Sequence, residues 1–200
     1  MTDVAVHAPP AAAPAAAADF EIIPRKGLPI VAVVLIATIV AIAANKLWPL
    51  EFLHIVFGAG WTVVDLFLGL ILGPILGSLA IPARIEMTKK LMPKMALLMP
   101  TLVTVTLAAG WQLGHLLGTV DSSYYRHGWI VASYIVVGVM AVIALGLLEP
   151  ANIAVLFELR KPRPNPEVIG RLMKRFIYTA GVTGVMQVAT FVIMTRVATG

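Results

Sequence analysis

Long apolar stretches alternate with short polar segments along most of this chain. The apolar stretches cover residues 28–47, 52–81, 95–120, 128–157 and 176–195. About 20 predominantly apolar residues are enough for an α-helix to cross a hydrocarbon core of roughly 30 Å. The pattern therefore predicts an all-α membrane protein with five transmembrane helices. We expect spans two to five to form a four-helix core, with the first span packed as a peripheral helix.

Two of the stretches are longer than one straight crossing requires, which predicts tilt, a kink or an extension beyond the bilayer. Pro74 lies inside the second stretch and Pro150 inside the fourth. Proline removes a helical hydrogen bond and crowds the preceding turn, so these two positions are the expected kink sites.

The N-terminal region differs from the rest of the chain. Residues 1–27 begin with an Ala- and Pro-rich run that cannot bury a core, so we expect a disordered tail there, followed by a single transmembrane domain over residues 28–200. Ala41-Ile42-Ala43 has the small-x-small form of a signal-peptidase site. The apolar stretch that contains it is longer than a usual signal-peptide core, which favours a retained first helix and leaves cleavage as the alternative.

The composition agrees with a membrane environment. The chain is 60% hydrophobic and only 12% charged, with a mean hydropathy of +0.93. Soluble domains carry about twice that fraction of charged residues. The chain has no cysteine, which excludes disulfides, thiolate metal sites, iron–sulfur clusters and cysteine nucleophiles.

The net charge of +5 reflects membrane topology. Basic residues concentrate in the segments on one side of the predicted spans, which by the positive-inside rule is the cytoplasmic side. The N-terminus is then cytoplasmic and the C-terminus outside, as in a multi-pass protein of a cell inner membrane. This distribution predicts contact with anionic lipids and no nucleic-acid partner. Twelve of the 15 basic residues belong to this set: Arg25, Lys26, Arg84, Lys89, Lys90, Lys94, Arg160, Lys161, Arg163, Arg171, Lys174 and Arg175.

Ionisable side chains inside a membrane are costly and point to function. At roughly 100° per residue, one stripe of the second span carries His54, Trp61 and Asp65, followed by Leu68 and Leu72. The third span carries a comparable stripe of Thr101, Thr104, Ala108, Trp111 and His115. His54 and His115 should lie about 6 Å and about 8 Å below the same membrane surface.

The matched depth of the two histidines predicts a shared site. We expect His54 and His115 to ligate a b-type haem between spans two and three, with Trp61 and Trp111 beside the macrocycle. Electron transfer to a redox partner protein or membrane complex would be the function. Whether the protein is an enzyme stays open, since the sequence contains no nucleotide-binding loop and no nucleophile triad.

Two alternatives remain open. Copper binding or transport would use His54, His115 and His127. Met92, Met95 and Met99 share a helical face and could add thioether ligands for Cu(I). In the second alternative the protein is a non-catalytic membrane subunit or scaffold, and every histidine is structural.

Asp65 lies deeper than His54, past the middle of the second span. A carboxylate at that depth must pair, take up a proton or face water, so Asp65 is a candidate for a proton or ion path. The structural alternative is a protonated Asp65 bonded to Thr101 or Thr104. In span five, the spacing of Thr179, Thr183 and Gln187 predicts interhelical hydrogen bonds.

Glycines repeat at four-residue spacing in the second and third spans. Small residues at this spacing let transmembrane helices pack closely. We therefore expect tight helix contacts at the following glycines: Gly69, Gly73 and Gly77 in span two, and Gly110, Gly114 and Gly118 in span three.

The stretch from Leu53 to Trp61, LHIVFGAGW, combines a leucine–histidine pair with small residues and a tryptophan. It resembles the helix-opening pattern of the CopD-like (copper-resistance protein D) and HemJ-like group of small helical membrane proteins. The segment Lys90–Met95, followed by Pro100-Thr101 and by Thr106–Gly110, is similar to the next helix of that group. The resemblance covers residues 51–118.

This resemblance implies a four-helix core with haem b or copper as cargo in different branches of the group. His54 is the position that matches the group's motif. The HemJ-like porphyrinogen oxidases also have a lysine in a later helix, and spans three to five of this chain contain none. The resemblance therefore does not extend to porphyrinogen oxidation.

Overall fold

The computed structural model describes residues 21–199. Within that range the chain is helical, without strands, and contains five helices long and apolar enough to cross a membrane. The predicted all-α, five-span architecture is therefore confirmed. Most of the predicted N-terminal tail lies outside the described residues; a 3-10 turn, Arg25–Gly27, leads directly into the first span.

Two of the five spans are interrupted by π-helical segments, and the other three are single helices. The interrupted second span consists of α2 (Leu47–Leu66), η2 (Phe67–Leu72) and α3 (Gly73–Ser78). The interrupted fourth span consists of α5 (His127–Ile143), η3 (Ala144–Leu148) and α6 (Glu149–Leu159). The single helices are α1 (Leu28–Ala44), α4 (Ile81–Leu116) and α7 (Pro166–Thr199).

The interruptions coincide with the two prolines expected to disturb their helices. Pro74 lies in the first turn of α3, directly after η2, and Pro150 lies in the first turn of α6, directly after η3. Proline lacks the N–H that would bond to the carbonyl four residues earlier, and its ring crowds that carbonyl. The turn before each proline widens into a π-helical segment, while the chain continues in the same span.

Two helices begin well before the apolar stretches from which they were predicted. Helix α4 starts at Ile81 and α7 at Pro166, whereas hydropathy predicted spans from residues 95 and 176. Both extra segments are rich in basic residues. Hydropathy detects the part of a helix that lies in lipid, and these helices continue into the polar boundary beyond it.

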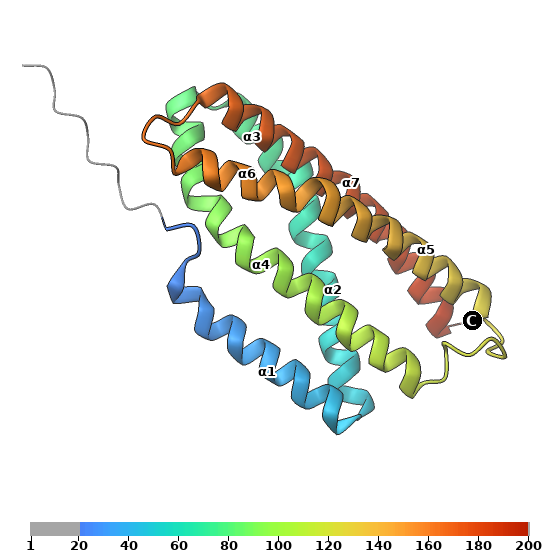
Figure 1. Cartoon of the computed structure of the whole chain (residues 1–200). Coiled ribbons are helices and arrows are strands. Elements are labelled where there is room, and N and C mark those ends of the chain that lie inside the picture. The colour runs from blue at the N-terminus through green and yellow to red at the C-terminus, as the bar shows by residue number, and fades with distance from the viewer. Residues whose placement is uncertain (1–20, 200) are drawn as a thin grey trace, which may run out of the picture.

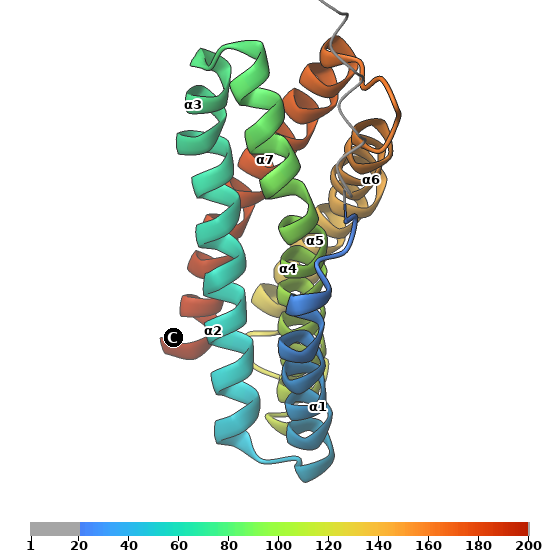
Figure 2. The same ribbon diagram turned by 90° about the vertical axis from the view of Figure 1, so that its left-hand side faces the viewer.

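The first helix lies on the periphery, as expected. Helix α1 contacts α4 and α2, and only Thr38 and Ala41 of its residues are buried (Figure 1). The remaining spans surround the main apolar core, in which α7 contacts α2, η2, α5, η3 and α6. Helix α7 crosses obliquely behind the rod formed by α2 and α3 (Figure 2).

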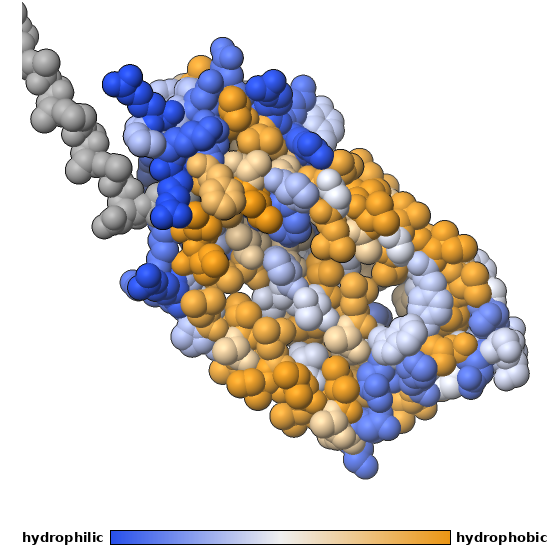
Figure 3. All heavy atoms as spheres, in the orientation of Figure 1, coloured by the Kyte–Doolittle hydropathy of each residue, from blue (hydrophilic) through white to orange (hydrophobic). Residues whose placement is uncertain are grey.

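Hydrophobic and hydrophilic residues separate along the molecule in the way a bilayer requires. Hydrophobic residues cover the middle of the visible face, and hydrophilic residues gather toward its two ends (Figure 3). Many large apolar side chains are exposed, among them Ile36, Val63 and Val142. Such side chains are stable when their surroundings are lipid, so the protein is a multi-pass integral membrane protein.

Candidate functional site

The second and fifth spans cross at glycines. Gly69 of η2 lies against Gly181 of α7, and a Cβ atom on Gly69 would overlap the Cα atom of Gly181. One turn further along α7, a Cβ atom on Gly184 would come within 3.0 Å of the backbone nitrogen of Leu66. The missing side chains let the two backbones approach closely, as small residues do in membrane helix pairs.

This close approach positions a polar cluster around Asp65, whose side chain is 0% exposed. Its Oδ2 atom accepts a hydrogen bond of 2.9 Å from the Thr183 hydroxyl and one of 2.8 Å from Nε2 of Gln187. Both donors come from α7 and are themselves buried. The interhelical hydrogen bonds predicted for Thr183 and Gln187 are thus confirmed, while Thr179 bonds within its own helix to the carbonyl of Arg175.

Two acceptor atoms in the cluster are left without a donor. Among the residues that the structure describes, neither Oδ1 of Asp65 nor Oε1 of Gln187 has a hydrogen-bond partner, and both atoms are buried. A buried polar atom without a partner costs about 1–3 kcal/mol, so such atoms are rare in native proteins. Both atoms can therefore accept a further hydrogen bond.

The face of the second span that carries Asp65 is the one predicted from its spacing. Trp61, Leu68 and Leu72 of the same stripe are all buried in the main core. Asp65 does not bond to span three, however. Thr101 bonds to the carbonyl of Leu97 in its own helix, and the partners of Asp65 are on α7. The structural alternative, in which Asp65 bonds to Thr101 or Thr104, is wrong, because the partners are on α7 and the sequence did not show which spans cross at Asp65.

His54 lies in the contact between α2 and α4. Its Nδ1 atom is 2.9 Å from the carbonyl oxygen of Thr106, to which it donates when it carries the ring proton. A Cβ atom on Gly110 would overlap the imidazole ring, so the absence of a side chain there makes room for it. This arrangement fixes the orientation of the ring.

His115 and Trp111 lie on a different side of α4. Both are exposed; their rings pack edge to face at 4.9 Å, and Trp111 lies 6.2 Å from the ring of Tyr134 on α5. The α2-facing side of α4 carries Val105 and Ala109 instead. The structure therefore does not bring His54 and His115 together, because the Trp111–His115 stripe points away from α2.

The other candidate metal ligands are also dispersed. His127 begins α5, and its buried Nδ1 atom has no partner within residues 21–199. In that same range no group of three or more His, Cys, Asp or Glu side chains is close enough to hold a metal ion. Met92, Met95 and Met99 share one face of α4, as predicted, and all three pack into the main apolar core.

One buried polar residue was not singled out by the sequence analysis. Asn152 of α6 is fully buried, and neither its amide nitrogen nor its amide oxygen has a partner in the described part of the chain. The sequence did contain a signal for this residue: Asn152 is an amide side chain in an apolar stretch, three residues after Glu149.

The candidate site among the described residues is thus the hydrogen-bonded cluster of Asp65, Thr183 and Gln187 beside the glycine crossing. Comparisons with protein-family models, with curated proteins and with solved structures find no match to the chain. The resemblance of residues 51–118 to the CopD-like and HemJ-like group therefore stays a prediction.

Proposed function

We propose that this integral membrane protein is proton-coupled and that Asp65 binds and releases the proton. The observation that supports the proposal is the pair of buried acceptors, Oδ1 of Asp65 and Oε1 of Gln187, that lack a donor among the described residues. A charged carboxylate inside the membrane is expensive unless a positive group balances it. The hydrogen-bond partners of Asp65 are neutral, so a proton is the simplest neutralising partner.

One proton also completes the hydrogen bonding. Nε2 of Gln187 already donates to Oδ2 of Asp65. A proton on Oδ1 turns that atom from an acceptor into a donor, and the amide oxygen of Gln187 is the acceptor left over in the cluster. The carboxylic acid of Asp65 and the amide of Gln187 each then supply one donor and one acceptor to the other. The carboxylate form of Asp65 has only acceptors, which leaves the amide oxygen of Gln187 without a donor.

Release of the proton requires the hydrogen bonds around Asp65 to break. The π-helical segments next to α7 could allow this movement. The π-helical segment η2 starts two residues after Asp65, and both η2 and η3 contact α7. Single π-helical turns are frequent at functional sites, because the helix can change its local hydrogen bonding there. In the proposed cycle, a shift of α7 along the glycine crossing moves Thr183 and Gln187 away from Asp65 and exposes the carboxyl group to water.

Infrared spectroscopy of the purified protein tests the bound proton directly. We expect a protonated-carboxyl band that shifts in D2O and that disappears in Asp65→Asn, a variant that keeps the side-chain shape. Glu149→Gln is the matched control, because it removes another carboxyl group of a transmembrane helix. Persistence of the band in Asp65→Asn would overturn the assignment of the proton to Asp65.

Proton movement is tested in vesicles that contain a pH-sensitive dye and the purified protein. With a membrane potential imposed by a potassium gradient, we expect proton uptake by the wild type to exceed that by Asp65→Asn at least tenfold. Glu51→Gln is the control, since Glu51 is an exposed carboxylate on the same helix. Equal uptake by wild type and Asp65→Asn would reject a proton path through Asp65.

We also propose that the basic end of the molecule faces the cytoplasm, as the positive-inside rule predicts. Because the chain has no cysteine, single cysteines can report the orientation. Exposed positions are available at Ser122 in the α4–α5 loop and Arg163 in the α6–α7 loop. In intact cells an impermeant maleimide should label Ser122→Cys and spare Arg163→Cys; the reverse pattern would invert the topology.

A haem or copper centre at His54 is the second candidate function. The Nδ1 contact with the Thr106 carbonyl supports it, since metal-binding histidines commonly donate one ring N–H to a carbonyl and ligate through the other nitrogen. The arrangement does not fit a haem held by both His54 and His115. If His54 is the ligand of a b-type haem, reduced-minus-oxidised spectra should show bands that His54→Ala removes and His115→Ala keeps.

Metal analysis distinguishes a haem from a copper ion at His54. Copper without haem absorbance, lost in His54→Ala, would indicate copper binding or transport. Absence of both haem and copper after supplemented expression would reject this candidate.

A further inference from the structure

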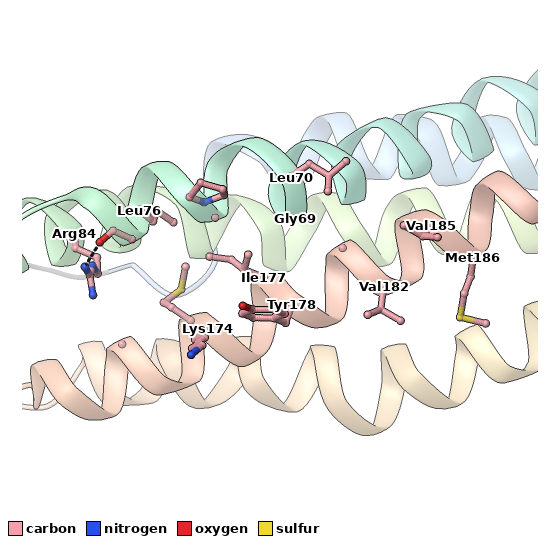
Figure 4. A pocket seen from close by; sticks show the side chains of 16 residues that line it. Gly69, Leu70, Leu76, Arg84, Lys174, Ile177, Tyr178, Val182, Val185 and Met186 are labelled. Carbon is pink, nitrogen blue, oxygen red and sulfur yellow. Dashed lines mark hydrogen bonds between the residues drawn. The ribbon is translucent and has the colours of Figure 1, made fainter.

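A groove runs between the second span and α7, beside the glycine crossing. Its volume is about 810 Å³, and its walls come from η2, α3, α7 and the start of α4 (Figure 4). Leu70 and Val185 lie toward one end of the groove, and Arg84 and Lys174 lie toward the other. The groove is thus apolar along most of its length and basic at one end.

Two glycines leave the groove hollow. Cβ atoms built on Gly77 of α3 and Gly170 of α7 would meet no described atom within 4 Å. These two residues differ from Gly69 and Gly73, whose missing side chains make room for Gly181 and Ile177 of α7. The space at Gly77 and Gly170 is therefore not needed for helix packing.

The basic end carries two positive groups. Nη2 of Arg84 donates to the carbonyl oxygens of Gly77 at 2.9 Å and Leu79 at 3.2 Å, and its buried Nε atom has no partner among residues 21–199. Lys174 is exposed, and its Nζ atom lies 5.8 Å from the ring centre of Tyr178. No acidic residue belongs to the part of the groove wall that the structure describes, so the charge at this end is uncompensated.

The length of the groove matches one leaflet of a bilayer. On α7 its wall runs from Gly170 to Met186, which at 1.5 Å per residue is about 24 Å. Half of a bilayer with its headgroups is roughly 20–22 Å thick, which is close to this length. The basic end lies with the basic loops, at the surface where the headgroups of that leaflet are found.

We propose that this groove binds one anionic phospholipid of the leaflet at the basic end of the protein. The phosphate group lies between Arg84 and Lys174, and an acyl chain follows the apolar wall past Gly77 and Gly170 toward Val185. Charge complementarity selects an anionic headgroup, and the groove is long enough for one acyl chain of that lipid. The site is separate from the Asp65 cluster, so the proposal does not rest on the proton-coupled function.

Native mass spectrometry of the full chain in detergent tests the site, with phosphatidylglycerol and phosphatidylcholine as the added lipids. We expect the wild type to retain one phosphatidylglycerol more strongly than phosphatidylcholine. Lys174→Gln should weaken that retention about fivefold, as expected for one basic residue at an anionic surface. Arg175→Gln is the matched control: Arg175 is the next residue, is exposed and does not line the groove.

A second pair of variants tests the hollow part of the groove. Gly170→Leu places a side chain in the groove at a position where its Cβ atom meets no described atom within 4 Å, and it should abolish retention of the bound lipid. Gly138→Leu is the control, because a Cβ atom there also meets no described atom within 4 Å and Gly138 lies outside the groove. Thermal unfolding of both variants verifies that they fold.

Three results would overturn the proposal. Equal retention of the two lipids would remove the role of charge, and unchanged retention in Gly170→Leu would place the lipid elsewhere. A dimer that Gly170→Leu dissociates would show that the groove binds a second copy of the chain in place of a lipid.

Discussion

Gly69 and Gly181 lie backbone against backbone, so that a Cβ atom added to Gly181 would be 3.2 Å from the Cα atom of Gly69. This contact sets the separation between the second and fifth spans. Asp65 is four residues before Gly69, and Thr183 is two residues after Gly181. The hydrogen bond between Asp65 and Thr183 therefore depends on a glycine pair that carries no polar side chain.

Gly69→Ala should destabilise the protein. The new methyl group overlaps the Cα atom of Gly181 and comes within 2.9 Å of its backbone nitrogen, so whole helices must move apart. Overpacking of this kind costs about 1–3 kcal/mol. Thermal unfolding in detergent should show a lower Tm. Gly138→Ala is the control: it meets no described atom within 4 Å and gains up to about 1 kcal/mol of helix propensity, so its Tm should not fall.

Thr183→Val should weaken the Asp65 cluster without a change in side-chain size. It removes one of the two donors to Oδ2 of Asp65, and the loss of such a buried partner costs about 1–3 kcal/mol. Thr190→Val on the same helix is the comparison, since Thr190 bonds to the carbonyl of Met186 and makes no bond to Asp65. Equal stability of the two variants, measured by denaturant unfolding, would show that the Thr183 bond contributes nothing.

Gly110→Ala should be destabilising because of His54. The added Cβ atom overlaps the imidazole ring, which must leave its position against the Thr106 carbonyl. His54→Ala in the same chain removes the ring and should make Gly110→Ala nearly neutral. A double-mutant cycle measures this coupling, for which contacting residues give about 0.5–3 kcal/mol. Additive effects of the two substitutions would contradict the packing of Gly110 on His54.

Arg126→Gln should loosen the C-terminal turn of α7. Nη1 of Arg126 donates to the carbonyl oxygens of Arg196 at 2.9 Å and Val197 at 2.8 Å, in the last turn of the helix. Hydrogen exchange of residues 193–199 should therefore become faster. Arg196→Gln keeps the carbonyl that accepts the bond and serves as the control. Unchanged exchange in Arg126→Gln would mean that this turn is held by other contacts.

The sequence predicted the five spans because hydropathy responds to the lipid that surrounds each helix. It also placed Asp65, Trp61, Leu68 and Leu72 on one face of the second span, and all four are buried. This part of the site follows from helix geometry alone, since residues three and four apart share a face.

The partners of Asp65 could not be predicted in the same way. Periodicity identifies which face of a helix is polar or small, but it does not identify the helix opposite that face. Thr101 and Thr183 are both threonines in apolar spans, and only the crossing at Gly69 and Gly181 distinguishes them. The same gap explains His115: the sequence predicted for it the same depth as for His54, but did not show that its side chain points away from α2.

The π-helical segment η2 changes the direction in which the side chains of the second span point after residue 72. A π turn contains one residue more than an α turn, so everything after η2 is rotated by about 100° relative to an uninterrupted helix. Gly73 owes its direction toward Ile177 of α7 to this offset. A single-residue deletion inside Phe67–Leu72 would restore a continuous α-helix and turn Gly73 away from α7, while Asp65 kept its place. Because of the extra residue, Asp65 before η2 and Gly73 after it both face α7.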